Sequence, residues 1–137
     1  TYEELLTVGK AAAALGIKHI KITGGEPLLR KNVTEFIARL KKTKGIETVT
    51  LTTNGILLPN YIEQLSKAGI DGINISLDTL EEKKFRKLTR NGEVKDVWKG
   101  ISSVIPYDQI NMKINCVLAG KRLAKRCRTC GRNRKEI

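Results

Sequence analysis

The sequence predicts an α/β fold built on parallel strands. Helical and extended segments alternate through residues 1–118 and are joined by short connections, which is typical of right-handed β-α-β units. Glycine and small polar residues follow three of the expected strands, over residues 23–26, 52–55 and 76–78. The pattern fits either an open doubly wound sheet or part of a barrel, and both folds bind ligands at the carboxyl ends of their strands.

The first helix is expected from Thr1 to about Leu15. Thr1 can cap it, and Glu4 can complete a capping box three residues later. Gly16 suits the left-handed conformation that ends many helices, and residues 18–23 then predict the first strand. The Gly-Gly-Glu-Pro segment over residues 24–27 is either a plain tight turn or a loop whose backbone approaches a ligand.

The second and third units repeat this pattern. Asn32 with Glu35 suggests another capped helix, which Gly45 ends, and residues 47–53 predict the second strand. Asn54-Gly55 turns the chain into a helix that begins near Pro59, and residues 72–77 predict the third strand.

Two further helices and one strand complete the expected fold. Thr79 is expected to cap a helix with Glu82 in the capping-box position, and this helix is expected to be buried through Phe85 and Leu88. A helix over residues 94–105, with Trp98 on its apolar face, leads to a fourth strand over residues 112–118.

The positive charge is concentrated near the end of the chain. The net charge is +12, and residues 119–137 contribute +7 from eight Lys or Arg and one Glu, so residues 1–118 carry 18 minus 13, or +5. This basic tail lacks aromatic residues for base stacking. We expect a solvated, poorly ordered end that binds nucleic acid at most weakly and without sequence preference.

Composition and cysteine content exclude several protein classes. The chain is 40% hydrophobic, its apolar runs are too short to cross a membrane, and no signal segment opens it, so we expect a cytoplasmic protein. Cys116 fits a buried strand position. Cys127 and Cys130 supply only two of the four ligands of a zinc site, and His19 lies far away, so no metal site is expected.

Each polar residue at the strand ends also has a structural interpretation. Thr52, Thr53 and Asn54 commonly satisfy a turn, and Ser76 and Asp78 can cap the next helix. Lys113 could equally be an ordinary surface lysine, because most lysines in folded proteins are exposed. Neither common phosphate loop, G-x-x-x-x-G-K-[ST] or G-x-G-x-x-G, occurs in the chain.

Four segments together resemble one enzyme family. KITGGEPLLRKN, LTTNGILL, AGIDGINISLDTLEEKKFRKLTR and MKINCV resemble, in order and spacing, the radical S-adenosylmethionine GTP 3′,8-cyclases that start molybdenum-cofactor synthesis. The G-G-E-P element is shared across the wider superfamily, and the longer third segment and the KINCV strand narrow the resemblance to the cyclases. The resemblance spans nearly all of residues 1–118.

The resemblance implies a partial (β/α) TIM-type barrel with about four β/α units in this chain. In such an enzyme a [4Fe-4S] cluster and S-adenosylmethionine generate a radical that begins the conversion of GTP to a cyclic pterin precursor, which is lyase chemistry. The resemblance further implies a cytoplasmic enzyme, mitochondrial in a eukaryote, that can form a homodimer at full length.

The resemblance assigns expected roles to seven residues and implies no catalytic residue in this chain. The expected contacts to S-adenosylmethionine are made by Gly24, Gly25, Glu26 and Ser76, and those to GTP by Lys21, Thr52 and Lys113. Lys21 stands where the family typically has arginine, which replaces a planar bidentate fork with one ammonium and weakens the contact.

The chain lacks the family's cluster-binding C-x-x-x-C-x-x-C loop. We therefore expect an internal fragment, inactive alone, whose cluster ligands lie outside this chain and whose tail is not family sequence. One alternative is part of another radical S-adenosylmethionine enzyme with a different substrate. The other is a non-catalytic module that binds polyanions through residues 119–137.

Overall fold

A computed structural model describes residues 1–89 and 92–116 of the chain. Four strands form one parallel sheet in the order β1-β2-β3-β4. The strands are β1 (His19–Ile22), β2 (Thr48–Thr53), β3 (Gly72–Ser76) and β4 (Asn111–Asn115). The helices are α1 (Tyr2–Ala14), the short 3-10 helix η1 (Pro27–Leu29), α2 (Val33–Lys41), α3 (Leu58–Lys67), α4 (Glu82–Thr89) and α5 (Val94–Val104).

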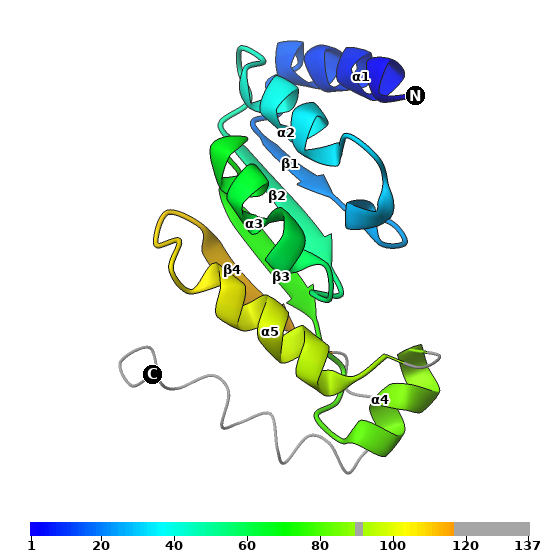
Figure 1. Ribbon diagram of the computed structural model, residues 1–137. Coiled ribbons are helices and arrows are strands. Elements are labelled where there is room, and N and C mark those ends of the chain that lie inside the picture. Colours follow the sequence, from blue (N-terminus) through cyan, green and yellow to red (C-terminus); the bar gives the residue numbers. More distant parts are fainter. Residues whose placement is uncertain (90–91, 117–137) are drawn as a thin grey trace.

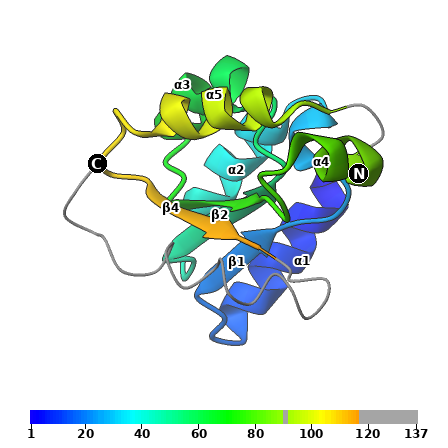
Figure 2. The same cartoon turned by 90° about the horizontal axis from the view of Figure 1, so that it is seen from below.

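The arrangement of the helices distinguishes between the two expected architectures. Helices α2, α3 and α5 lie on one side of the sheet, and α4 lies beyond the carboxyl end of β3 (Figures 1 and 2). Helix α1 packs at the β1 edge on the same side, where Gly9 approaches Leu40 and Ile20. A doubly wound sheet needs helices on both faces and a reversal of strand order. The sheet is therefore part of a (β/α) barrel wall.

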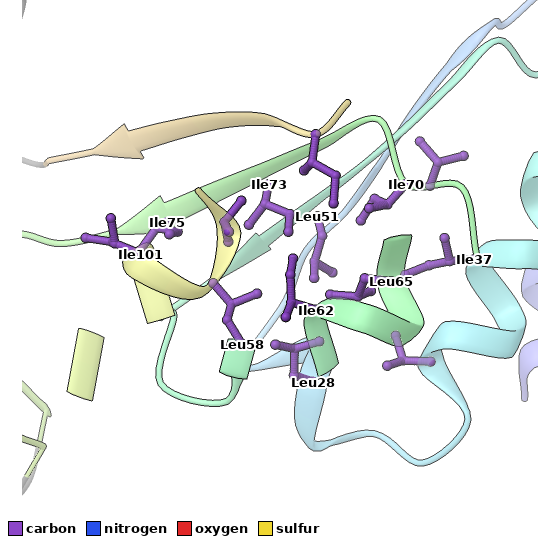
Figure 3. Packing of buried hydrophobic residues seen from close by; sticks show 14 of the residues in the cluster. Leu28, Ile37, Leu51, Leu58, Ile62, Leu65, Ile70, Ile73, Ile75 and Ile101 are labelled. Atoms are coloured by element: carbon purple, nitrogen blue, oxygen red, sulfur yellow. The ribbon is translucent and has the colours of Figure 1, made fainter. Parts of the chain in front are cut away.

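The core lies between the sheet and these helices. Leu51, Ile73 and Ile75 point from the strands toward the helices, where they meet side chains such as Leu65 and Ile101 (Figure 3). Alternation along each strand produces this arrangement, because successive side chains point to opposite faces of a sheet. Of the helices in the described ranges, none has the length and apolar character that crossing a bilayer requires.

The opposite face of the sheet, here called the open face, carries polar residues and one glycine. No helix covers this face within residues 1–89 and 92–116 (Figures 1 and 2). By strand alternation and register, it comprises His19, Lys21, Thr48, Thr50, Thr52, Gly72, Asn74, Ser76, Asn111, Lys113 and Asn115.

A charged contact joins the amino ends of the strands. The Asp71 carboxylate accepts hydrogen bonds from Lys41 Nζ at 2.8 and 2.9 Å and from the backbone N–H of Val49 at 2.6 Å. Lys41 also donates to the Glu47 carbonyl, and the Asp71 carbonyl accepts from the Asn111 N–H at 2.9 Å. This contact fixes α2 and three strands relative to one another. It lies at the end of the sheet opposite residues 24–27, here called the glycine loop.

Local sequence patterns predicted the start of α2 correctly but its side-chain cap wrongly, and they placed the start of α4 too early. The capping box at Thr1 and Glu4 is present. Asn32 instead adopts φ 61° and makes no side-chain cap, because a left-handed residue is needed to turn the chain from η1 into α2. Thr79 Oγ1 accepts from the Glu81 N–H, and α4 begins only at Glu82, so Thr79 forms a turn before the helix.

Two side chains expected in the core are exposed. Cys116 follows the last residue of β4, and its thiol donates to the Asp78 carbonyl at 3.5 Å. Trp98 is 48% exposed, because the buried stripe of α5 is formed by Val97, Ile101 and Val104 instead. Phe85 is buried as expected, whereas the Leu88 side chain and residues 117–118 of the expected fourth strand lie outside the described part.

Helix α5 approaches the turn after β2 through two glycines. Gly55 has φ 85°, and an added Cβ at Gly100 would overlap its carbonyl oxygen. Side chains are excluded from this contact on both sides, since a Cβ at Gly55 would also press on Ile75 at 3.0 Å. The backbone of the β2–α3 turn is thereby held against α5.

The Gly55–Gly100 contact predicts a large cost for one added methyl group. Gly100→Ala should lower the free energy of unfolding by about 2 kcal/mol or more, because backbone must move. The matched control is Gly9→Ala in α1, where the new Cβ would lie 2.9 Å from Leu40 Cδ2, the end of a side chain rather than backbone. This control should shift stability by less than about 1 kcal/mol. Equal urea midpoints for the two variants would contradict the assignment.

Candidate functional site

The loop after β1 exposes its backbone at the carboxyl end of the sheet. Gly24 and Gly25 adopt φ 104° and 50°, conformations that favour glycine. A Cβ at either position would meet no atom within 4 Å, so open space surrounds the loop. The loop can therefore present its N–H and C=O groups to a ligand, and ligand binding at this loop stays a prediction.

Glu26 fastens this loop to the neighbouring strand. Its carboxylate accepts hydrogen bonds from the Leu28 N–H at 3.1 Å, the Thr53 hydroxyl at 2.7 Å and the Asn54 N–H at 2.7 Å. An ionised carboxylate has about four acceptor positions, so one remains for a further donor. The expected contact between Glu26 and a cofactor amine stays a prediction, and the structure adds a positioning role.

Stacked side chains hold the far end of the same loop. The Arg30 guanidinium lies 4.1 Å from the centre of the Tyr2 ring, which stacks on Phe36 with centroids 4.5 Å apart. Burial raises the pKa of Tyr2, and the nearby Arg30 charge opposes that rise. The loop is thus anchored at Glu26 and at Arg30, while its glycines remain exposed.

Two of the residues expected to bind GTP are brought into one row. Thr52 pairs in register with Asn74, and Asn74 pairs with Lys113, so the three occupy adjacent strands on the open face. Neighbouring strands lie about 4.8 Å apart, which places the outer two within reach of one ligand group. We call Thr52, Asn74 and Lys113 the polar row.

Lys21 and Ser76 share the open face but lie outside the polar row. Ser76 is exposed and pairs with Asn115, closer to the carboxyl end of the sheet. Lys21 is exposed on β1 and pairs with Thr50, closer to the amino end. Three strand spacings of about 4.8 Å separate the strand of Lys21 from that of Lys113.

The turn after β2 confirms a structural role for two residues that follow Thr52. Thr53 is 2% exposed, and its hydroxyl oxygen accepts from the Gly55 N–H at 3.1 Å while donating to Glu26. Asn54 Oδ1 accepts from the Ile56 N–H at 3.0 Å, as in an Asx turn. His19 lies at the other end of the sheet, where its Nδ1 is 2.6 Å from Thr48 Oγ1.

Sequence reasoning missed Asn74. It is 8% exposed and faces away from Ile73 and Ile75, which point into the core. An available signal was an amide in the middle of an otherwise apolar strand, since asparagine is uncommon there.

The described residues do not form a metal centre. No group of three or more His, Cys, Asp or Glu side chains within residues 1–89 and 92–116 is arranged to hold a metal ion. Cys116 is the one cysteine described, and a four-iron cluster is held by several thiolates. Cys127 and Cys130 lie outside the described residues, so the structure assigns no ligand for an iron–sulfur cluster.

The sequence matches a known family and several curated relatives. A model of the Radical SAM superfamily matches residues 1–120. The chain is 48% identical over 119 residues to the GTP 3′,8-cyclase of Heliobacterium modesticaldum and 43% identical over 120 residues to that of Alkaliphilus oremlandii. These matches cover 87% and 88% of the chain but 36% and 38% of the relatives. The chain spans about a third of the length of the curated relatives it matches.

Two solved structures have a similar fold. A crystal structure of BtrN in complex with AdoMet and 2-DOIA matches with a TM-score of 0.51 at 19% identity, covering 82% of this chain and 43% of that chain. A second BtrN structure, in an open conformation, matches with a TM-score of 0.50 at 16% identity over the same shares. At this level of identity the similarity concerns the fold alone.

The Thr53 hydroxyl should stabilise the contact between Glu26 and the turn after β2. Thr53→Val removes the donor to Glu26 and the acceptor of the Gly55 N–H, and should lower the free energy of unfolding by about 1–3 kcal/mol. Thr53→Ser keeps both hydrogen bonds and should cost only about 1 kcal/mol for the lost methyl group. Urea unfolding measures both. If the serine variant is as unstable as the valine variant, the methyl group rather than the hydroxyl stabilises the turn.

Proposed function

The chain belongs to the radical SAM superfamily, and on this basis we propose that it forms the cofactor- and nucleotide-binding part of a GTP 3′,8-cyclase. The geometric observation that carries the proposal is the polar row, in which Thr52 and Lys113 from distant segments flank one place on the open face. The names of the relatives, which are GTP 3′,8-cyclases, support GTP as the substrate.

The glycine loop would bind the methionyl end of S-adenosylmethionine. When bound, this cofactor supplies radical chemistry that protein side chains lack. Gly24 and Gly25 would offer backbone groups to the amino and carboxyl groups, and Glu26 would use its remaining acceptor position for the ammonium. Ser76 would contact the same cofactor from the carboxyl end of β3. Anchoring by Glu26 and Arg30 keeps the loop in place before the cofactor arrives.

The open face would bind GTP. Lys113 would meet a phosphate group as a point charge, and the Thr52 hydroxyl would donate to the same group. Lys21 would offer a second ammonium from β1. In the proposed enzyme a [4Fe-4S] cluster is required as well, and because the described residues do not fit one, no step is assigned to it.

A second candidate is a radical SAM enzyme with another substrate. Lys21 favours it, because lysine replaces the arginine that the cyclases typically use to bind the nucleotide. A single ammonium accepts many anionic partners, whereas a guanidinium fork selects for planar or bidentate ones.

GTP binding should depend on Lys113, whereas cofactor binding should not. Isothermal titration of the 137-residue chain should detect both GTP and S-adenosylmethionine, and Lys113→Met should weaken GTP binding about tenfold by removing a charged hydrogen bond. Lys42→Met removes the same charge from the exposed end of α2 and is the matched control. If the chain binds S-adenosylmethionine but shows no binding of GTP at millimolar concentration, the second candidate is favoured.

Lys21 offers a gain-of-affinity test. Lys21→Arg should strengthen GTP binding about threefold to tenfold, because a fork donates two parallel hydrogen bonds to phosphate oxygens. Lys10→Arg on α1 controls for the general effect of arginine. An unchanged affinity for GTP in the Lys21 variant would mean that this side chain does not contact the nucleotide.

A further inference from the structure

We propose that Asn74 binds a phosphate group of the nucleotide, between Thr52 and Lys113. This inference rests on the proposed function, and it assigns a further binding residue to the same open face. It starts from a polar side chain whose position the fold does not explain.

The Asn74 side chain is largely buried and makes no hydrogen bond within the described part of the chain. The residue is only 8% exposed, and none of the hydrogen bonds of the described residues involves its amide. The amide atoms still reach solvent, so water supplies their hydrogen bonds when no ligand is bound. Most buried polar side chains bond to the protein itself, so an amide that the fold does not use is a candidate ligand contact.

The direction of the Asn74 side chain follows from its strand. Its neighbours Ile73 and Ile75 are 1% and 0% exposed and point into the core (Figure 3), so Asn74 points to the open face. Its atoms keep some access to that face, because the buried side-chain atoms without partners in the described part do not include them. A ligand on the open face can therefore replace the water that the Asn74 amide contacts.

The composition of the open face selects an anionic ligand. Its residues include Lys21 and Lys113 and contain no Asp or Glu. Thr52, Asn74 and Lys113 can each donate a hydrogen bond, and they stand on adjacent strands about 4.8 Å apart. A phosphate group has several acceptor oxygens and negative charge, so it matches three donors, one of them an ammonium, better than a neutral sugar or base does.

A structural role for Asn74 makes the opposite predictions. If the amide stabilised the strand, an apolar residue there would be destabilising. If it serves a ligand, Asn74→Val replaces an amide that bonds to no other part of the fold with a residue that favours strands, so stability without ligand should stay equal or rise. Stability and binding therefore separate the two roles.

The experiment compares the unmodified chain with three variants and uses three ligands as probes. The unmodified chain, Asn74→Val and Asn74→Asp are titrated with GTP, tripolyphosphate and guanosine, and Asn60→Asp on exposed α3 is the matched control for the added charge. Asn74→Val should weaken GTP and tripolyphosphate about tenfold, and Asn74→Asp by more than that, because a carboxylate also repels the ligand. The affinity for guanosine should not change. The thermal midpoint of Asn74→Val without ligand should equal or exceed that of the unmodified chain.

The outcomes distinguish this inference from the proposed function. Suppose that Asn74→Val weakens tripolyphosphate binding and that the unmodified chain binds GTP no more tightly than tripolyphosphate. This result supports the phosphate site and contradicts a nucleotide substrate. GTP binding that Asn74→Val leaves unchanged overturns the inference and leaves the proposed function standing. The inference is also overturned if Asn74→Val lowers the thermal midpoint and leaves the affinity for tripolyphosphate unchanged. Failure of the unmodified chain to bind tripolyphosphate overturns it as well.

Discussion

The separation of apolar and polar side chains across one parallel sheet is the constraint on which the other features depend. Parallel sheets are usually covered on both faces, and their strands are then apolar throughout. Here Leu51, Ile73 and Ile75 supply one apolar face, and the alternate positions are polar. A polar face in a parallel sheet fits the interior of a barrel that holds a ligand, and the same alternation that builds the core orients the polar row.

The two ends of the sheet are stabilised in different ways. At the amino ends, the Asp71 carboxylate joins Lys41 to the backbone of β2, in a partly buried contact with several hydrogen bonds. At the carboxyl ends, Glu26 joins the glycine loop to Thr53 and Asn54. Both carboxylates accept backbone N–H groups from a neighbouring segment. Gly24 and Gly25 can therefore adopt positive φ angles while the Glu26 hydrogen bonds keep the loop in one position.

Most of the fold could be predicted from the sequence, because local signals and tertiary structure agree. The alternation of β2 and the capping box at Thr1 are examples. Prediction failed at the connections and at the outer strand. Asn32 adopts a left-handed conformation between η1 and α2, and Cys116 is exposed together with Ile114, which precedes it by two residues in β4.

The candidate site was predictable only in part. The resemblance pointed to Thr52 and Lys113, and strand register then placed them in one row. The hydrogen bonds of Glu26 were not predictable, since they join segments far apart in the chain. Asn74 was missed because a single sequence does not show which face of a strand is covered. Only the register and the exposure of each side chain reveal that.

The open face also bears on how such a protein can evolve. Residues that would contact a ligand there, such as Lys21 and Ser76, are exposed and contribute little to the core. Substitutions at these positions should leave the apolar packing on the other face intact, because the two sets of side chains alternate and do not touch. A change of substrate would then need few compensating mutations, which gives this architecture a simple route to new specificities.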